Sequence, residues 1–392
     1  MLNGPFAPWP SFTEEEIEAA AAVLRSNKVN YWTGTECRSF ESEFAQWAGC
    51  SHAVSLSNGT LALDLALKVL GIGPGDDVVV TPRSFIASAS CVVTAGARPI
   101  FADVDRESQN LTAKTVSEVL TPNTRAVIVV HLAGYPCDMD ALMSLAQERN
   151  IYVIEDCAQA HGARYKGRSV GSIGHINAWS FCQDKIMTTG GEGGMVTTNR
   201  SDLWGKAWSY KDHGKSYDAV YNRAHPPGFR WLHEGFGTNW RMLEVQGVIG
   251  RIQLRRMADW QAARERNAQA LLAVAANCPA LRIPHVPADV QHAWYRCYLF
   301  VRPERLKAGW SRDRIVGEIN KRGVPCFQGS CSEIYREKAF VDAGLQPAHS
   351  LPVAHELGET SIAFLTHPTI TVEQIGRACD ALHAVMTDAT AG

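Results

Sequence analysis

Three short segments of the sequence hold the residues that could do chemistry. In residues 57–60, Gly59 and Thr60 begin a predicted helix, and the free backbone amides of a helix N-terminus suit a phosphate group. Residues 155–161 open with two acids directly after an apolar strand, and residues 180–185 end another strand on Lys185. A buried lysine loses proton affinity and becomes an amine nucleophile. The three segments predict one site if the fold brings them together.

Taken singly, each segment also has an ordinary structural explanation. Gly59 and Thr60 can simply cap a helix, Asp156 can do the same, and Lys185 can be solvated or paired with an acid. A metal site has little support, because His161 is the only histidine near Asp156 and no spacing matches a known metal site. The glycines of residues 190–194 are no dinucleotide fingerprint, because the pattern GxGxxG is absent.

In combination, the three segments point to one cofactor. Phosphate anchor, acid and amine follow one another on successive strand ends. These are the parts that pyridoxal 5′-phosphate requires: an anchored phosphate, an acid that keeps the pyridine nitrogen protonated, and an amine that forms a Schiff base with the aldehyde. Asp156 is then as necessary as Lys185, because the ring draws electrons only while it is cationic.

The elements that must position these segments alternate along the first half of the chain. Short apolar runs alternate with helices of ten or more residues, which is typical of a parallel sheet with both faces buried. The predicted strands span residues 53–56, 77–81, 99–103, 126–131, 151–155, 177–182 and 194–198. Ligands bind such sheets at the carboxyl ends of the strands, where all three segments lie.

Past residue 239 the pattern changes to long helices. Besides helices from Thr13 and over residues 38–48 and 139–149, we predict helices over 242–256, 260–275, 312–322 and 372–386, with one strand over 294–301. We therefore expect an α/β fold of two domains. Residues 1–250 form a large domain with a mostly parallel central sheet, and residues 251–392 form a smaller α+β domain.

The composition fits a globular enzyme. Of 392 residues, 46% are apolar and 20% charged, and the formal net charge of −2 gives no overall attraction to nucleic acid or an anionic membrane. We expect no signal peptide in residues 1–11, and no apolar run reaches the roughly 20 residues of a membrane helix. Eleven cysteines without CxxC spacing fit reduced thiols, so we expect a cytoplasmic protein.

A series of motifs runs in order through residues 5–255, with looser similarity beyond. They are Trp32-Thr33-Gly34, Ser57-Asn58-Gly59-Thr60-Leu61-Ala62-Leu63, Gly73-Pro74-Gly75-Asp76-Asp77-Val78, Phe101-Ala102-Asp103-Val104-Asp105, His131-Leu132-Ala133-Gly134, Gly237-Thr238-Asn239-Trp240-Arg241-Met242, and residues 155–162 and 185–195. In these the sequence resembles the DegT/DnrJ/EryC1/StrS family of sugar aminotransferases. The resemblance implies the fold of the fold-type I pyridoxal phosphate enzymes.

The resemblance assigns roles to single residues. Lys185 matches the lysine that forms the Schiff base with the cofactor, and Asp156 matches the aspartate that pairs with its pyridine nitrogen. Gly59, Thr60 and Ser180 match the phosphate-binding positions. The resemblance thus implies the same cofactor as the residues themselves.

Three further positions follow from the same resemblance. Phe85 matches the aromatic residue that stacks on the ring, and Gln159 the glutamine beside it. Asn239 resembles an asparagine that reaches the cofactor phosphate of the neighbouring subunit, which implies a homodimer with shared active sites. Two departures bear on Phe85 and Glu192: residues 190–194 hold one extra glycine, and residues 81–86 are one residue short of the common form.

The implied activity is ping-pong transamination. L-glutamate donates the amino group, and the 4-keto carbon of a nucleotide-linked 6-deoxy sugar receives it, as in the biosynthesis of amino sugars for lipopolysaccharide O-antigen. Thr188-Thr189 resembles the 4-aminating subgroup rather than the 3-aminating one, which has Asn-Leu-Gly after the lysine; relatives with histidine in place of the lysine are deoxygenating enzymes. The alternatives are a 3-keto-sugar or cyclitol aminotransferase and a cofactor-binding regulator without turnover.

The loop of residues 213–237 is rich in glycine, proline, histidine and aromatic residues. Long loops are usually functional or lie at an interface, so we expect it near the active site. Its aromatic residues Tyr217, Phe229 and Trp231 could stack on a base or pack at the dimer interface, and we expect packing. The cations in and beside it are candidates for binding a diphosphate or the donor carboxylate, with a solvated surface as the alternative: Lys211, His213, Lys215, Arg230 and Arg241.

Overall fold

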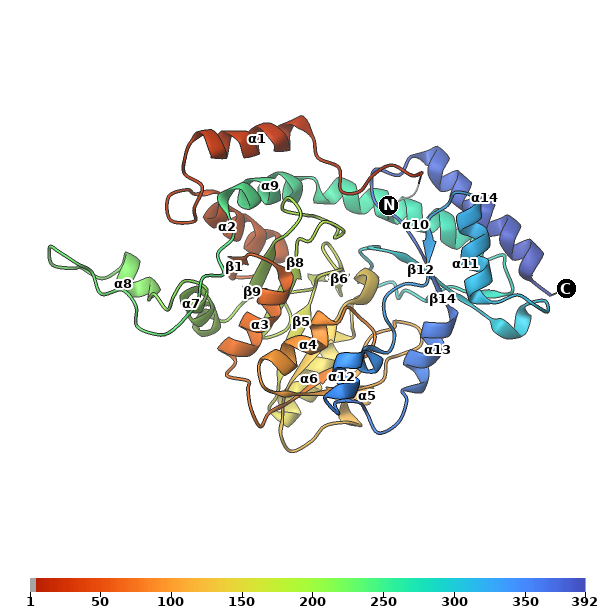
Figure 1. Cartoon of the computed structure of the whole chain (residues 1–392), viewed down its shortest axis with the longest axis horizontal. Coiled ribbons are helices and arrows are strands. Elements are labelled where there is room, and N and C mark those ends of the chain that lie inside the picture. Colours follow the sequence, from red (N-terminus) through yellow and green to blue (C-terminus); the bar gives the residue numbers. More distant parts are fainter. Residues whose placement is uncertain (1–4, 392) are drawn as a thin grey trace.

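A mixed seven-stranded sheet forms the centre of the protein, seen in the computed structural model, which describes residues 5–391 (Figure 1). β9 is antiparallel to β1 and β8, whereas the other neighbours are parallel, so the sheet is mostly parallel as predicted. In spatial order the strands are β1 (His52–Leu56), β9 (Gly194–Thr198), β8 (Ile176–Ser180), β5 (Tyr152–Asp156), β4 (Thr124–Val130), β2 (Asp77–Val80) and β3 (Arg98–Phe101).

Both faces of this sheet are covered by helices. In β2, Val78 and Val80 pack into one apolar cluster and Val79 into another, because successive side chains of a strand point to opposite faces. Because both faces of the sheet are buried, the sequences of its strands are continuous apolar runs. One cluster includes residues of α3 (Gly59–Val69), α4 (Ala87–Thr94) and α7 (Ser201–Tyr210), and the other includes residues of α5 (Ala113–Ser117) and α6 (Met139–Arg149).

Three helices form a layer beside the sheet. α1 (Glu14–Arg25) and α2 (Glu36–Ala48) both pack against α9 (Glu244–Arg255). α1 begins as predicted: Thr13 and Glu16 form a capping box. The carboxylate of Glu16 also accepts hydrogen bonds from the side chains of Gln253 (2.8 Å) and Arg256 (2.8 Å), which fixes α1 on the end of α9.

A second, antiparallel sheet lies in the C-terminal part of the chain, in the order β10 (Leu281–Arg282), β12 (Cys297–Val301), β14 (Ser361–Phe364) and β13 (Cys326–Phe327). It shares an apolar core with α10 (Met257–Ala275), α11 (Arg312–Lys321) and α14 (Val372–Ala389). Phe6 packs into this core, although residue 6 lies in the predicted large domain. The predicted boundary at residue 250 falls inside α9, so we propose the end of α9 as the division.

Shorter elements complete the described part of the chain. A small sheet joins β11 (Val290–Gln291), β6 (Arg164–Tyr165) and β7 (Arg168–Ser169). The loop of residues 213–237, called the arm below, contains the short helix α8 (Tyr217–Tyr221) and extends from the body of the protein beside α7 (Figure 1). α12 (Lys338–Asp342) and α13 (Pro352–Thr360) follow β13 in sequence. In residues 5–391 we find no helix with the length and apolarity needed to span a bilayer.

Candidate active site

A cavity of about 560 Å³ lies at the carboxyl ends of the central strands. Seven residues that the sequence predicted for cofactor binding line it together, and they come from segments as far apart in the chain as Gly59 and Lys185. The three segments therefore meet at one place, as the parallel sheet predicts. The seven residues are Gly59, Thr60, Phe85, Asp156, Gln159, Ser180 and Lys185.

Lys185 lies in the turn that follows β8, with 15% of its side chain exposed. Its Nζ is 3.5 Å from the carboxylate of Asp184. Burial alone would lower the pKa of Lys185, but Tyr295, Asp184, Cys182 and Asp156 outweigh it, and the pKa lies above its ordinary value. The expectation that burial makes this lysine a free amine is therefore wrong for the cofactor-free chain, because the acids beside it hold the proton.

The extra glycine after Lys185 is absorbed by the turn that leads to β9. Gly190 and Gly191 both have positive φ angles, 88° and 120°, which glycine adopts without strain. Gly191 donates its backbone N–H to the hydroxyl of Thr188 (3.0 Å), and Thr188 donates its hydroxyl to the carbonyl of Phe181 (2.8 Å). The insertion thus leaves Lys185 facing the cavity, and Glu192 also lines it.

Asp156 ends β5 and is almost fully buried, with 5% exposure. Its carboxylate accepts hydrogen bonds from the Ser88 hydroxyl (2.7 Å) and the backbone N–H of Ala158 (3.1 Å). Burial raises the pKa of Asp156 above its ordinary value, although these two donors and the charge of Lys185 act against it. A buried carboxylate with no cationic hydrogen-bond partner in the described chain fits a protonated ring nitrogen in the cavity.

The N-terminus of α3 forms the phosphate-sized end of the cavity. Asn58 caps the helix: its side chain accepts a hydrogen bond from the N–H of Leu61 (3.0 Å). Gly59 and Thr60 are the first two residues of the helix. A Cβ at Gly59 would lie 2.5 Å from the Cβ of Ser180, so glycine is required for β8 to approach so closely. The amides, the helix dipole and the Ser180 hydroxyl together suit a phosphate.

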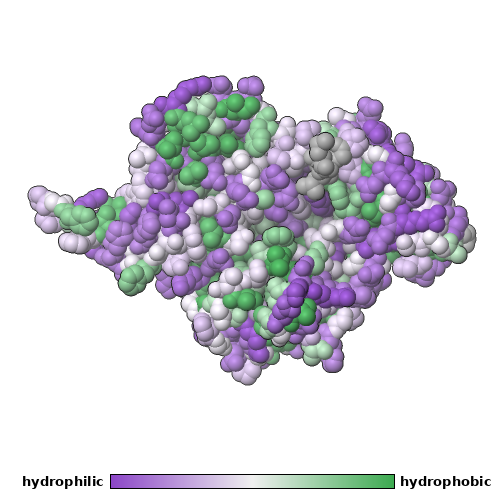
Figure 2. All heavy atoms as spheres, in the orientation of Figure 1, coloured by the Kyte–Doolittle hydropathy of each residue, from purple (hydrophilic) through white to green (hydrophobic). Residues whose placement is uncertain are grey.

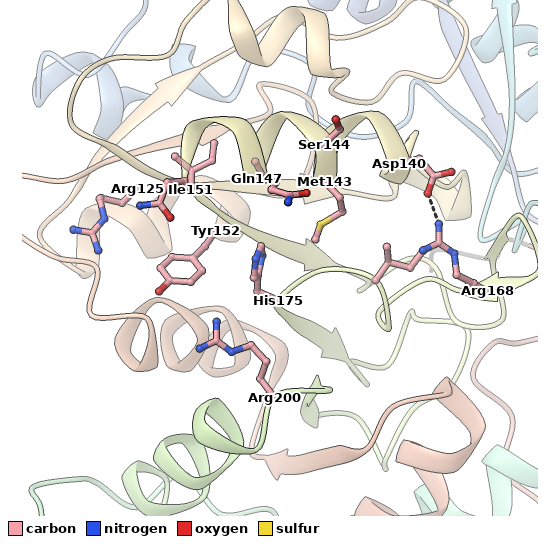
Figure 3. Close-up of a pocket in the computed structure, with 13 residues that line it drawn as sticks. Arg125, Asp140, Met143, Ser144, Gln147, Ile151, Tyr152, Arg168, His175 and Arg200 are labelled. Atoms are coloured by element: carbon pink, nitrogen blue, oxygen red, sulfur yellow. Dashed lines mark hydrogen bonds and ion pairs between the residues drawn. The ribbon is translucent and has the colours of Figure 1, made fainter.

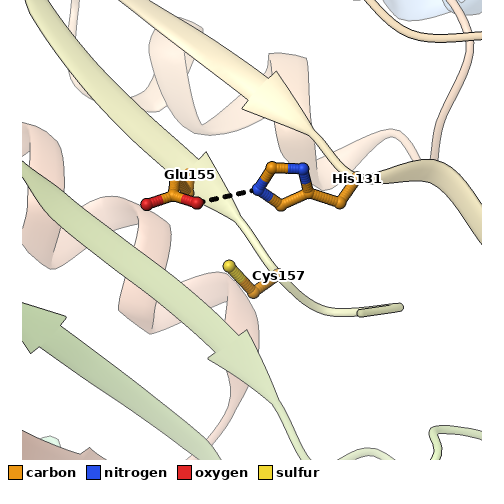
Figure 4. A group of neighbouring side chains, drawn as sticks. All are labelled: His131, Glu155 and Cys157. Atoms are coloured by element: carbon orange, nitrogen blue, oxygen red, sulfur yellow. Dashed lines mark hydrogen bonds and ion pairs between the residues drawn. The ribbon is translucent and has the colours of Figure 1, made fainter. Parts of the chain in front are cut away.

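Beneath Asp156, a second acid is held by protein groups. His131 accepts the backbone N–H of Cys137 at Nδ1 (3.0 Å), so its Nε2–H donates to Glu155 (2.9 Å; Figure 4). Three backbone amides, including those of Gly171 and Ile173, complete the hydrogen bonds of that carboxylate. Cys157 is the third member of this buried group, and burial raises the pKa of its thiol well above the ordinary value. The hydrogen bonds of His131 and Glu155 therefore fix the ends of β4 and β5.

The cations predicted for substrate binding do not line the cavity of the single chain. Lys211 is buried and bonds to Glu41 (2.7 Å), and Arg241 bonds to Asp212 (2.6 Å). His213 is exposed, and Arg230 lies exposed on the arm.

Two other predictions concern that region. Asn239, predicted for a neighbouring subunit, is exposed, and its side chain accepts the N–H of Arg241 at 3.5 Å. Phe229 and Trp231 contact each other, with ring centroids 4.9 Å apart, but remain 77% and 81% exposed. The substrate roles of these residues stay predictions.

Sequence reasoning missed several residues of the site. Ser88 was detectable, because it lies four residues after Ser84; both line the cavity, Ser88 from the first turn of α4 and Ser84 from the segment before that helix, with their hydroxyls 2.9 Å apart. Asp184 precedes the lysine directly. Tyr295, which donates its hydroxyl to Asp184, lies 111 residues away in sequence and left no signal.

A larger hollow of about 750 Å³ lies at the opposite, amino ends of the strands (Figure 3). Arg125, Tyr152 and His175 line it near the starts of β4, β5 and β8. Its other arginines are paired, Arg168 with Asp140 and Arg200 with Asp202. As described, its lining includes no lysine. The amine chemistry therefore belongs to the smaller cavity.

A buried lysine, a buried aspartate and a helix N-terminus around one cavity define a pyridoxal phosphate enzyme. Residues 10–383 match the sequence profile of the DegT/DnrJ/EryC1/StrS aminotransferase family, and the chain belongs to that family.

Similar proteins cover nearly the whole chain. A solved aminotransferase from Psychrobacter cryohalolentis is 60% identical, with a TM-score of 0.97 over 98% of this chain and 99% of that one. GDP-perosamine synthase of Caulobacter vibrioides is 35% identical over 94% of this chain and 98% of that protein. The dTDP-3-amino-3,4,6-trideoxy-alpha-D-glucose transaminase of Streptomyces venezuelae is 33% identical over 96% and 93%. The protein is thus a pyridoxal phosphate-dependent sugar aminotransferase with the fold of its relatives.

Proposed function

We propose that this aminotransferase moves the amino group of L-glutamate to the 4-keto carbon of a nucleotide-linked 6-deoxy sugar. The observation that carries the proposal is the meeting of Lys185, Asp156 and the N-terminus of α3 in one cavity. Thr188-Thr189 after the lysine supports amination at C4. The names of the relatives differ in nucleotide and in sugar, so the assay must decide both.

Each residue of the cavity has a definite task in this proposal. The cofactor, when bound, supplies a cationic ring that stores the electrons of the C–H bond broken during transamination. Lys185 would hold the cofactor through its aldehyde, and its Nζ, once free, would be the group that carries the proton removed from the amino donor. Asp156 keeps the ring nitrogen protonated. Gly59, Thr60 and Ser180 would hold the phosphate of the cofactor.

The sugar nucleotide needs cations for its diphosphate. We propose that His213 and Arg230 bind the diphosphate, because both are exposed and neither lines the cavity of its own chain. Arg241 and Lys211 are candidates of a different kind. Since both already form short ion pairs with acids, they contact substrate only if those pairs rearrange, and otherwise they fix the base of the arm.

We also propose a homodimer in which Asn239 of one subunit reaches the cofactor phosphate of the other. Two features support it. Asn239 lies outside the cavity of its own chain, and the arm exposes Phe229, Trp231 and Phe236, the last completely. Monomeric proteins rarely leave such apolar groups together in water.

The decisive experiment uses the purified protein loaded with pyridoxal phosphate. Glutamate should bleach the visible absorbance of the bound cofactor, and a nucleotide-linked 4-keto-6-deoxy sugar should restore it and yield an amino sugar, identified by mass and NMR. Preferential amination of the 3-keto isomer would contradict the proposal that the enzyme aminates C4. Absence of bleaching would favour the regulator without turnover.

Replacing Lys185 by alanine tests the central assignment. Lys185→Ala should remove the visible band and lower the amination rate about 10³-fold, because both the covalent anchor and the proton carrier are lost. Lys206→Ala, on the exposed face of α7, is the matched control and should behave as the wild type. Amination by Lys185→Ala at the wild-type rate would show that another residue does this work.

A further inference from the structure

Two residues outside the predicted set surround the amine of Lys185. Asp184 lines the cavity and lies 3.5 Å from Nζ. The hydroxyl of Tyr295 donates to the same carboxylate (2.5 Å), and Nζ lies 5.5 Å from the centre of the Tyr295 ring. The three side chains therefore form a chain of contacts: phenol to carboxylate, carboxylate to ammonium, ammonium over phenol ring.

Tyr295 is rigidly placed. It lies two residues before β12 of the second sheet and is 6% exposed. Its backbone N–H donates to the carbonyl of Ala133 (2.8 Å), which belongs to the turn after β4 of the central sheet. Tyr295 thus spans the two sheets, and it holds Asp184 from the side of the second one.

Lys185 itself is fixed through its backbone. Its carbonyl accepts the indole N–H of Trp9 (2.8 Å), which comes from the N-terminal segment. In the part of the chain that the structure describes, Asp184 is the acid in contact with the amine.

The charges around this group agree with its geometry. Burial alone would raise the pKa of Asp184, but Lys185, Tyr295 and Arg296 outweigh it, and the pKa lies below its ordinary value. Asp184 is therefore ionised at neutral pH. Cys182 and Asp156 also raise the pKa of Lys185, and the charge of Lys185 in turn helps to lower the pKa of the buried His161.

We propose that Asp184 and Tyr295 are positioning residues for the catalytic lysine. The carboxylate, held by the phenol, receives the Lys185 ammonium whenever the amine is not covalently engaged, and keeps it at the edge of the cavity. This inference rests on the proposed role of Lys185. It adds that the amine returns to a fixed place, set jointly by the two sheets, instead of leaving for solvent.

The test follows the reaction of cofactor-free protein with pyridoxal 5′-phosphate across pH. Only the neutral amine attacks the aldehyde, so the combination rate, read from the absorbance at the visible edge, falls as pH drops below the pKa of Lys185. Asp184→Asn removes the charge at 3.5 Å and should move this fall to lower pH by about one unit. At a fixed pH on the slope, combination should then be about tenfold faster.

Two further variants separate charge from placement. Asp184→Glu keeps the charge and should keep the fall near its wild-type pH. Tyr295→Phe releases the carboxylate and also removes the group that contributes most to raising the Lys185 pKa, so we expect the fall to move to lower pH and, in addition, a lower plateau rate. The matched control is Tyr165→Phe, which removes a similar hydrogen bond to Asp138 (2.6 Å) far from the cavity and should leave the profile unchanged.

The outcomes are distinct. A profile of Asp184→Asn that coincides with the wild type, or an equal shift in Tyr165→Phe, overturns the inference. If Asp184→Asn does not fold, as judged by thermal unfolding, Asp184→Ser removes the same charge and takes its place. Lys185→Ala is run beside each variant: if it combines with the cofactor at the wild-type rate, the assignment of Lys185 fails instead.

Discussion

Glu155 and Asp156 are neighbours in sequence, yet burial affects them in opposite ways. Because successive side chains of β5 point to opposite faces, Asp156 faces the cavity and Glu155 faces His131. Burial alone raises the pKa of both. At Glu155, His131 and backbone amides outweigh burial, and the pKa lies below the ordinary value. At Asp156, the hydrogen bonds from Ser88 and Ala158 do not outweigh burial, and the pKa lies above it. Glu155 therefore stabilises the fold, and Asp156 weakens it until a cation arrives.

We predict that Asp156→Asn stabilises the cofactor-free protein. The amide oxygen of Asn can still accept the N–H of Ala158, and its NH2 can donate to the Ser88 hydroxyl in place of accepting from it. The buried charge is gone, so the free energy of unfolding at pH 7 should rise by about 1 kcal/mol. The unfolded carboxyl ionises near pH 3.9 and the folded one at higher pH, so the gain is absent below about pH 4 and grows as the pH rises. Urea unfolding at several pH values measures it, and cofactor affinity should fall at the same time.

Glu155→Gln should behave in the opposite way. The folded pKa of Glu155 is depressed, so its stabilisation is present above the unfolded pKa, about 4.3, and is lost as pH falls through the folded pKa. Gln breaks a buried acid–histidine pair, and we expect a loss of about 3 kcal/mol at pH 7 that shrinks toward acid pH. A stability change of the same sign in both variants would contradict this account.

At this scale the sequence predicted the residues that chemistry requires but not those that hold them. Lys185, Asp156 and Gly59 stand at strand or helix ends, and strand ends can be located from apolar periodicity. Tyr295 could not be placed, because its contact with Asp184 depends on how the second sheet packs on the first. The direction of the Lys185 pKa shift could not be predicted for the same reason, because it depends on the contacts of Lys185 with Tyr295 and Asp184.

At the scale of elements, the turn between β1 and α3 is the tightest part of the site. The carbonyl of Asn58 would lie 2.2 Å from a Cβ at Gly194 in β9, and the Cβ of Ser180 in β8 would lie 2.5 Å from a Cβ at Gly59. Two strands and a helix therefore converge where the phosphate is expected. Glycine is needed at both positions because any side chain would push the elements apart.

Gly59→Ala should weaken binding of the phosphate end of the cofactor. The added methyl group would collide with Ser180, so the strand and helix must separate, and the affinity for pyridoxal 5′-phosphate should fall at least about tenfold, about 1.4 kcal/mol. Binding of unphosphorylated pyridoxal should change less. Gly205→Ala in α7 is the control, since nothing lies within 4 Å of its Cβ, and it should gain about 0.5–1 kcal/mol of stability. Equal losses for both ligands would place the defect elsewhere.

Element prediction succeeded where periodicity is strong. The helix at residues 139–149 and the strand at 194–198 have the predicted bounds, and the other long helices differ by a few residues at their ends. β13 escaped prediction because its two residues are too few for a period. β14 was also not predicted, although β2 and β3, which were, are equally short. The antiparallel direction of β9 also left no pattern, since both of its faces are buried whichever way it runs.

At the scale of the molecule, the surface has apolar regions that the single chain does not cover. Figure 2 shows one over α1, where Ile17 and Leu24 are 50% and 59% exposed. Another lies on the arm, where Phe236 is fully exposed beside Trp231 and Phe229. The arm departs from a base fixed by the Arg241–Asp212 pair, so its direction is set by the body of the protein. A second copy of the chain is the partner that we propose for these surfaces.

Mixing two inactive variants tests whether each site needs both chains. In the proposed dimer, one site is built from Lys185 of one subunit and Asn239 of the other. Lys185→Ala and Asn239→Ala should each be inactive or weak alone, but after unfolding and refolding together half of the dimers are hybrids, and one of their two sites joins both wild-type residues. We therefore expect about a quarter of the wild-type amination rate from an equal mixture. If Asn239 acted within its own chain, every hybrid site would lack one residue and mixing would restore nothing. A refolded mixture of Lys185→Ala with wild type, whose rate should be about half, controls for the yield of refolding.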